Sequence, residues 1–186
     1  MEFIRVTFTK MPSEVTKKQR SFYEDRARRQ FIKYLAYTNF FDKVLTDAEI
    51  ETAKKGYLPE DLDIHHIFPI SGTSSEDVSS FTNMAILHKN THKAINKHIF
   101  DTQLSVLLNQ PNYSQTDIWL PQFDPVDADR IIAIRSGDTR LPADIRYGVQ
   151  MLNAKYGFEN TGKQKKIVQP TPKEMVFIQG NLKARF

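Results

Sequence analysis

The stretch between residues 62 and 100 constrains the fold more than any other part of the sequence, because its pattern changes sharply three times. A short apolar run over 62–67 is followed by Pro69, which cannot donate a ladder hydrogen bond. A polar loop, SGTSSEDVSS, separates this run from a second apolar run over 84–87. Helical spacing then begins near Asn90. The pattern predicts two short strands joined by a long loop and followed directly by a helix.

All five histidines of the chain lie between residues 65 and 98. Imidazole is a neutral metal ligand and a base near neutral pH, so this clustering indicates a site. Neighbours on a strand point to opposite faces, so His65 and His66 are expected to have different roles. On the following helix, His92 and Asn96 are four residues apart and share a face.

Three further side chains in this stretch have candidate roles. Asn83 precedes the second apolar run, where its amide could brace the loop or orient an imidazole. Asp63 shares a strand face with His65 and could accept a hydrogen bond from that ring. His88 falls at a strand end, and its surroundings favour packing or a phosphate contact over metal binding.

The segment LDIHHIFPISGTSSEDVSSFTNMAILHKNTHKAIN resembles the motif of the HNH (ββα-metal, His-Me finger) endonuclease family. The matching features are a His-His-x-x-Pro strand, an Asn-Met where the family usually has Asn-Leu, and a helix histidine nine residues after that asparagine. The approach, DAEIETAKKGYLPEDLDIHH, resembles the short helix, glycine and proline that often precede the motif. The resemblance covers residues 46–99.

The resemblance implies a role for each matching residue. His66 corresponds to the general base that activates water, and Asn83 to the middle letter of the motif, which holds the loop and helps to place the base. His65 fills the first metal-ligand position, where many relatives have Asp, and His92 fills the second. Asn96 falls where some relatives have a third ligand, although Asn is a weaker ligand than the His found there.

These residues together predict a metal-dependent endonuclease that hydrolyses phosphodiester bonds of DNA, with RNA not excluded. The reaction needs an activated water and a cation that neutralises charge on the phosphate. The resemblance implies one divalent metal ion and products with a 5′-phosphate and a 3′-hydroxyl. Magnesium or manganese is expected in function, and zinc or nickel is possible because imidazole ligands favour such ions. Restriction enzymes, phage and mobile-element nucleases, and nuclease toxins all use this motif.

Two other functions compete with this reading. The first is a nucleic-acid-binding protein whose motif keeps a stabilising metal but does not cleave, and the intact His66 argues against it. The second is a metal-dependent hydrolase of another class. The spacing from Asn83 to His92 is what that alternative leaves unexplained.

Charge is distributed unevenly along the chain, whose net charge is +4. Residues 1–31 carry a net charge of +4 and residues 155–186 carry +5, whereas the middle carries −5. Basic ends suit a protein that grips a polyanion, although solvated basic tails are equally common. The candidate contacts to a nucleic-acid backbone are Lys89, Lys93, Arg26, Arg28, Arg29, Lys163, Lys165 and Lys166.

The rest of the sequence predicts mainly helices. Thr46 and Glu49 have the spacing of a capping box, which starts a short helix that ends at Gly56. The remaining predictions are a strand over 3–9, a helical segment over 17–45, a loop over 109–125, helices over 126–136 and 142–156, and an extended basic arm over 158–186.

We expect an α+β fold that is mostly α, a helical domain that embeds one ββα-metal motif. The predicted parts are an N-terminal strand and basic helical segment (1–45), the nuclease core (46–102), a C-terminal loop with helices (103–157) and the basic arm (158–186).

Composition excludes several alternatives. The chain has no cysteine, so disulfides, thiolate nucleophiles and cysteine-based zinc sites are ruled out. It also lacks a long apolar run and a secretory signal, so no membrane partner is expected and the predicted location is cytoplasmic. The C-terminal helices and arm could complete a substrate groove or mediate a homodimer.

Overall fold

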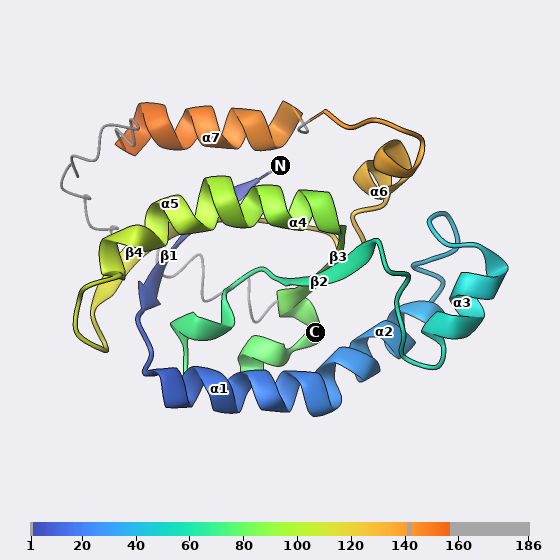
Figure 1. Ribbon diagram of the computed structural model, residues 1–186, viewed down its shortest axis with the longest axis horizontal. Coiled ribbons are helices and arrows are strands. Elements are labelled where there is room, and N and C mark those ends of the chain that lie inside the picture. The colour runs from blue at the N-terminus through green and yellow to red at the C-terminus, as the bar shows by residue number, and fades with distance from the viewer. Residues whose placement is uncertain (1, 141–142, 157–186) are drawn as a thin grey trace.

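The computed structural model describes residues 2–140 and 143–156, and shows an α+β fold that is about half helical (Figure 1). Two antiparallel sheets of two strands each, β1–β4 and β2–β3, lie among the helices. The expected α+β class is therefore confirmed. The helices and strands are β1 (Phe3–Thr9), α1 (Ser13–Phe22), the π-helical turn η1 (Tyr23–Ala27), α2 (Arg28–Tyr37), α3 (Asp47–Ala53), β2 (Leu62–His66), the 3-10 turns η2 (Ile70–Gly72), η3 (Glu76–Ser79) and η4 (Phe81–Asn83), β3 (Met84–His88), α4 (Lys89–Ile95), the π-helical turn η5 (Asn96–Phe100), α5 (Asp101–Leu104), the 3-10 turn η6 (Ser105–Leu107), β4 (Gln115–Pro121), α6 (Ala128–Arg135) and α7 (Ala143–Tyr156).

The first helical segment runs through α1, η1 and α2 without a break in the helical backbone. The predicted helix over 17–45 is right for its middle and wrong at its end. The helix stops after Tyr37, and Asn39 adopts a left-handed φ of 63°. Phe41 and Leu45 lie in the turns that follow α2, and both side chains are buried. Their helical spacing in the sequence therefore reflects packing in the core and not a continued helix.

The capping box predicted before α3 is present. The Thr46 N–H donates to Glu49 Oε2 at 2.8 Å, and the Glu49 N–H donates to Thr46 Oγ1 at 3.4 Å. These two bonds satisfy donors that the first helical turn leaves free. Gly56 follows the helix with a φ of +92°, a conformation that glycine adopts at little cost.

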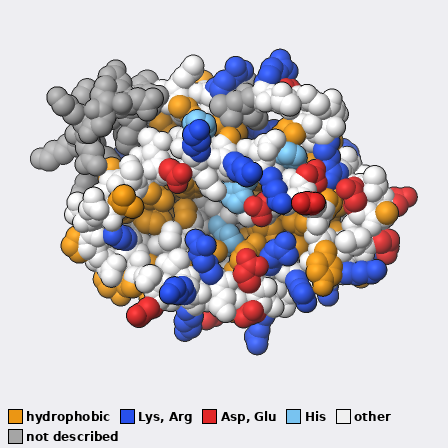
Figure 2. All heavy atoms as spheres, viewed as in Figure 1, with side chains coloured by type: hydrophobic (Ala, Val, Ile, Leu, Met, Phe, Trp, Pro, Cys, Tyr) orange, Lys and Arg blue, Asp and Glu red, His pale blue; other side chains and the backbone are white. Residues whose placement is uncertain are grey.

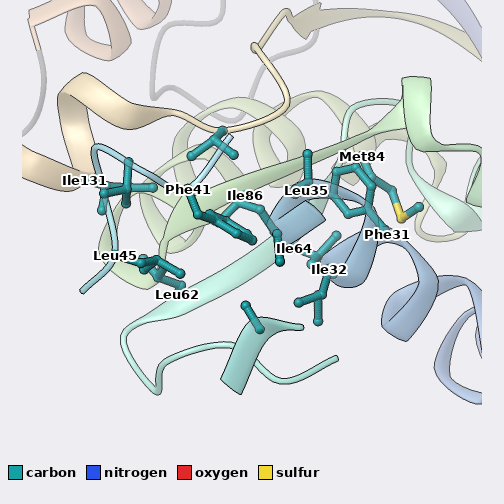
Figure 3. Close-up of a cluster of buried hydrophobic side chains, with 14 of the residues drawn as sticks. Phe31, Ile32, Leu35, Phe41, Leu45, Leu62, Ile64, Met84, Ile86 and Ile131 are labelled. Carbon is teal, nitrogen blue, oxygen red and sulfur yellow. The ribbon is translucent and has the colours of Figure 1, made fainter. Parts of the chain in front are cut away.

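The β2–β3 hairpin lies between two layers of helices, with α1 and α2 on one side and α4 with α5 on the other (Figure 1). Alternate strand residues therefore enter different cores. Ile64 and Ile86 pack with α2 in the cluster drawn in Figure 3, whereas Ala85 and Leu87 pack toward α4. Both predicted strands and the helix after them are confirmed, and each face of the hairpin is buried.

The segment predicted as a loop over 109–125 contains a strand, so that prediction was wrong. β4 pairs with β1 along its whole length, from Phe3 opposite Pro121 to Thr9 opposite Gln115. Ile118 and Leu120 alternate toward the core, as a strand requires. The neighbouring Pro, Asn and Asp residues obscure this alternation in the sequence, and the partner strand is far away in the chain.

The second core joins the β1–β4 ribbon to the α4–α5 side and to α7, through residues such as Phe8, Ile99, Ile118 and Leu152. The predicted helices near 126–136 and 142–156 correspond to α6 and α7. The predicted arm over 158–186 lies outside the described residues. No helix in the described part of the chain is long and apolar enough to cross a membrane.

Candidate active site

The two adjacent histidines of β2 project from opposite faces of the hairpin, as strand geometry demands. His65 lies on the side of α4, where its ring centroid is 5.1 Å from that of His92. His66 lies on the side of α1 and α2, where its ring meets that of Tyr23. The expectation that these neighbours point to opposite faces of the strand is confirmed.

His65 is enclosed by three rings and is only 2% exposed. Besides His92, its ring lies 5.6 Å from that of Phe100 and 5.5 Å from that of Phe123. Burial lowers the pKa of His65 well below its ordinary value, so the imidazole is neutral. Its Nε2 atom is buried and has no hydrogen-bond partner among the described residues. A buried polar atom without a partner costs about 1–3 kcal/mol, so this nitrogen is a candidate ligand atom.

His92 on α4 is oriented by a carboxylate on β2. Its Nδ1 lies 2.8 Å from Asp63 Oδ2. Burial raises the pKa of Asp63, but the hydrogen bond and the charge of His92 outweigh burial and the net pKa is lowered. In the neutral form of His92, an ionised Asp63 accepts the proton of Nδ1, which leaves the lone pair of Nε2 free. Asp63 shares a strand face with His65, as expected, but the ring it orients is that of His92.

His66 is half-buried against the first helical segment. Its ring meets the Tyr23 ring in an edge-to-face arrangement, with centroids 4.6 Å apart. Burial first, and then the charges of His92 and Arg20, lower the pKa of His66 to about 4. The ring is therefore neutral at pH 7 and can accept a proton. Within the part of the chain that the structure describes, its Nε2 atom has no hydrogen-bond partner.

Asn83 braces the loop that joins the two strands. Its Oδ1 accepts from the Phe68 N–H at 2.7 Å, and its Nδ2 donates to the carbonyls of Phe68 and Val78 at 2.9 and 2.7 Å. The Ile67 N–H also donates to the Asn83 carbonyl at 2.9 Å. Asn83 therefore fixes the chain immediately after His66, and it contacts the loop rather than an imidazole.

A second group of bonds holds the start of β2 and the start of α4. The His88 Nδ1 accepts from the Asn90 N–H at 3.1 Å and so caps α4. Arg135 on α6 makes two hydrogen bonds to Asp61, at 2.8 and 2.9 Å, and two to Glu49, at 3.2 and 3.4 Å. Because the Lys89 N–H donates to the Asp61 carbonyl at 2.8 Å, this clamp ties α3 and α6 to the hairpin.

The residues present fit a metal ion at His65 and His92 in part. Two imidazoles bonded to one ion at about 2.1 Å have ring centroids roughly 5 Å apart, which is the separation found here. Asn96, the third predicted ligand, is exposed at the start of η5. Among the described residues, no group of three or more His, Asp or Glu side chains is arranged to hold a metal.

Basic side chains border the histidines. Figure 2 shows histidines at the surface between α4 and the α1–α2 segment, with Lys and Arg side chains on both sides. Lys89 is half-buried and close enough to Asp63 for its charge to lower the pKa of that carboxyl. Lys93, Arg26 and Arg29 are exposed, and Arg28 is half-buried. Lys163, Lys165 and Lys166 lie outside the described residues.

Three aromatic residues that contact His65 or His66 were not predicted from the sequence. Tyr23 belongs to η1, and Phe100 ends η5, so each π-helical turn places a ring against one of the two histidines. Phe123 comes from the segment after β4. An aromatic residue in a helical apolar pattern gives no sign of which side chain it touches, so no local signal could have found them.

Comparisons of the chain with protein-family models, with curated proteins and with solved structures found no match.

Proposed function

We propose that this chain is a metal-dependent endonuclease of the HNH type that hydrolyses phosphodiester bonds of DNA. The observation that carries the proposal is the buried, partnerless Nε2 of His65 beside His92, whose ring is oriented by Asp63. An imidazole held by a carboxylate beside a second imidazole with a free nitrogen is a common arrangement at metal sites. The β2–β3–α4 order that presents these residues supports the same assignment.

In this proposal, His65 and His92 hold one divalent ion, with water and substrate oxygens completing its coordination. The bound ion would neutralise charge on the phosphate and the leaving oxygen. His66, on the other face of β2, is the general base, because its neutral ring can take a proton from the attacking water. Asn83 fixes the loop behind His66, and Tyr23 restricts the orientation of the His66 ring.

The second candidate is a nucleic-acid-binding protein that keeps a stabilising metal but does not cleave. The exposure of Asn96 argues against it, because a stabilising metal needs a closed set of protein ligands and two imidazoles leave coordination positions open. The free nitrogen on His66 favours cleavage, because a purely structural site needs no such base.

The deciding experiment is incubation of supercoiled plasmid with purified protein and Mg, Mn, Zn or Ni, with EDTA as the metal-free control. The expected result is metal-dependent nicking by the wild type and none by His66→Ala. His98 lies outside the proposed site, so His98→Ala is the matched control and is expected to nick like the wild type. DNA binding without nicking by the wild type would favour the non-cleaving protein. Neither binding nor nicking would overturn both candidates. An RNA substrate tests the choice of nucleic acid.

A further inference from the structure

Exposed aromatic side chains concentrate on one part of the molecule. Of the eight large hydrophobic side chains that are exposed among the described residues, four lie on α2, on the turn after it and after α3. They are Tyr34, Tyr37, Phe40 and Tyr57. Four exposed rings gathered outside the candidate active site are typical of an interaction surface.

Two of these rings are paired with cations. The Arg29 guanidinium lies 5.3 Å from the centroid of the Tyr57 ring, and the Lys54 ammonium lies 6.0 Å from that of Tyr37. Arg29 and Tyr37 both belong to α2, whereas Lys54 and Tyr57 follow α3. Each ring–cation pair therefore joins a residue of α2 to a residue that follows α3. We call the surface formed by Arg29, Lys33, Tyr37, Lys54 and Tyr57 the ring–cation surface.

The backbone holds this surface in a fixed shape. A Cβ atom on Gly56 would lie 3.2 Å from the Arg29 Cβ, so the chain passes close to α2 just before Tyr57. Arg29, Lys33 and Tyr37 are spaced four residues apart and form one stripe on the outer face of α2. By the helical rise, the stripe is about 12 Å long.

The charge of the surface is positive at its centre. Within the described residues, Arg29 and Lys33 form no ion pair, whereas Lys54 pairs with Glu51 at 2.6 Å. Tyr37 is 68% exposed and Tyr57 is 48% exposed, so both rings present area to a ligand. Figure 2 shows an exposed hydrophobic side chain flanked by Lys and Arg side chains over α2 and α3.

We propose that the ring–cation surface binds single-stranded nucleic acid, with bases stacked on Tyr37 and Tyr57 and phosphates held by Arg29 and Lys33. Aromatic rings with interleaved cations are what such ligands require, because every base has a face to stack and every nucleotide carries a charge. A duplex keeps its bases stacked internally, so it can use only the cations. The surface needs no metal and no cleavage, so it goes beyond the nuclease proposal and stands without it.

The test is the dissociation constant of a fluorescein-labelled dT15 oligonucleotide, measured by anisotropy with the full chain in EDTA at constant salt. Tyr37→Ala and Tyr57→Ala are each expected to weaken binding about fivefold or more, as loss of one stacked base does. Tyr147→Ala, an equally exposed tyrosine on α7, is the matched control and is expected to leave binding unchanged. Tyr37→Phe keeps the ring and is expected to bind like the wild type.

Three outcomes would overturn the proposal. They are no binding of dT15 by the wild type, equal affinity for dT15 and for the corresponding duplex, and equal effects of Tyr37→Ala and Tyr147→Ala. A chain that binds dT15 through these rings but never nicks DNA would support this inference and contradict the nuclease proposal.

Discussion

The Nδ1 atom of His92 lies 2.8 Å from Oδ2 of Asp63, so the first strand of the hairpin orients a side chain of the helix packed against it. This bond crosses 29 residues of chain and joins the two elements that carry the proposed metal ligands. It selects one tautomer of the imidazole, because an ionised carboxylate accepts only a proton that Nδ1 carries. The same face of β2 carries His65, so one strand provides both a ligand and the group that orients its partner.

Replacing Asp63 with Asn is expected to weaken metal binding about 10- to 100-fold, as loss of such a partner does at other sites. The amide keeps the shape of the side chain but can present either its oxygen or its NH2 group to Nδ1, so the tautomer is no longer fixed. Titration calorimetry with Mn or Ni measures the effect. Asp25→Asn, on the exposed face of η1, is the control. Equal affinities for wild type and Asp63→Asn would contradict the orienting role.

Replacing Asn83 with Ala is expected to lower the free energy of unfolding by about 3 kcal/mol, because it removes the bonds to the buried Val78 carbonyl and to the partly buried carbonyl and N–H of Phe68. Urea unfolding followed by circular dichroism gives the difference. Asn90→Ala, at an exposed position on α4, is expected to change stability by less than about 0.5 kcal/mol. A loss of similar size in both variants would show that the loop is held by other contacts.

Features that depend only on residues close together in the sequence were predicted correctly. The capping box at Thr46 and Glu49 depends on residues three apart, and the opposite orientation of His65 and His66 follows from strand geometry alone. The β4 strand was missed because its partner β1 lies more than 100 residues away, and its alternation is interrupted by turn-forming residues. Elements with strong local signals could be read from the sequence, but the partners they pack against could not.

The same limit applies to the candidate site. The roles of His65 and His92 were expected from the resemblance to HNH nucleases. The contact of His66 with Tyr23 joins residues 43 positions apart and depends on how the first helical segment packs on the hairpin. Asp63 was predicted to orient the nearer histidine on its own strand face, and the structure joins it to His92 on the adjacent helix. A choice between two rings on one side of a hairpin depends on helix packing, which periodicity does not give.

Tyr23 restricts the His66 ring through an edge-to-face contact, so its removal is expected to impair cleavage more than binding. In the proposed nuclease, Tyr23→Ala is expected to lower kcat about tenfold or more, since a misplaced base loses the geometry of proton transfer. KM is expected to change little, and Tyr23→Phe, which keeps the ring, is expected to restore kcat. Steady-state cleavage of a labelled oligonucleotide gives both constants. A Tyr23→Phe variant as slow as Tyr23→Ala would assign the effect to the hydroxyl rather than to the ring.

The Asp61–Arg135 pair makes the clamp sensitive to acid. The hydrogen bonds from the Arg135 guanidinium hold the pKa of Asp61 below its ordinary value. Because the folded pKa is the lower one, the stabilisation is fully present above the unfolded value of about 3.9 and is lost as pH falls through the folded value.

Asp61→Asn is therefore expected to destabilise the protein above pH 5 by no more than about 1 kcal/mol, because the pair is partly exposed and screened. The difference from the wild type is expected to shrink toward zero below the folded pKa of Asp61, where the wild-type carboxyl is protonated as well. Urea unfolding of both proteins between pH 6 and pH 2 measures this difference. Asp47→Asn, in the exposed first turn of α3, is the control for carboxylates without an ion pair. A difference between Asp61→Asn and the wild type that stays constant over the whole range would show that Asp61 acts through its shape and not through its charge.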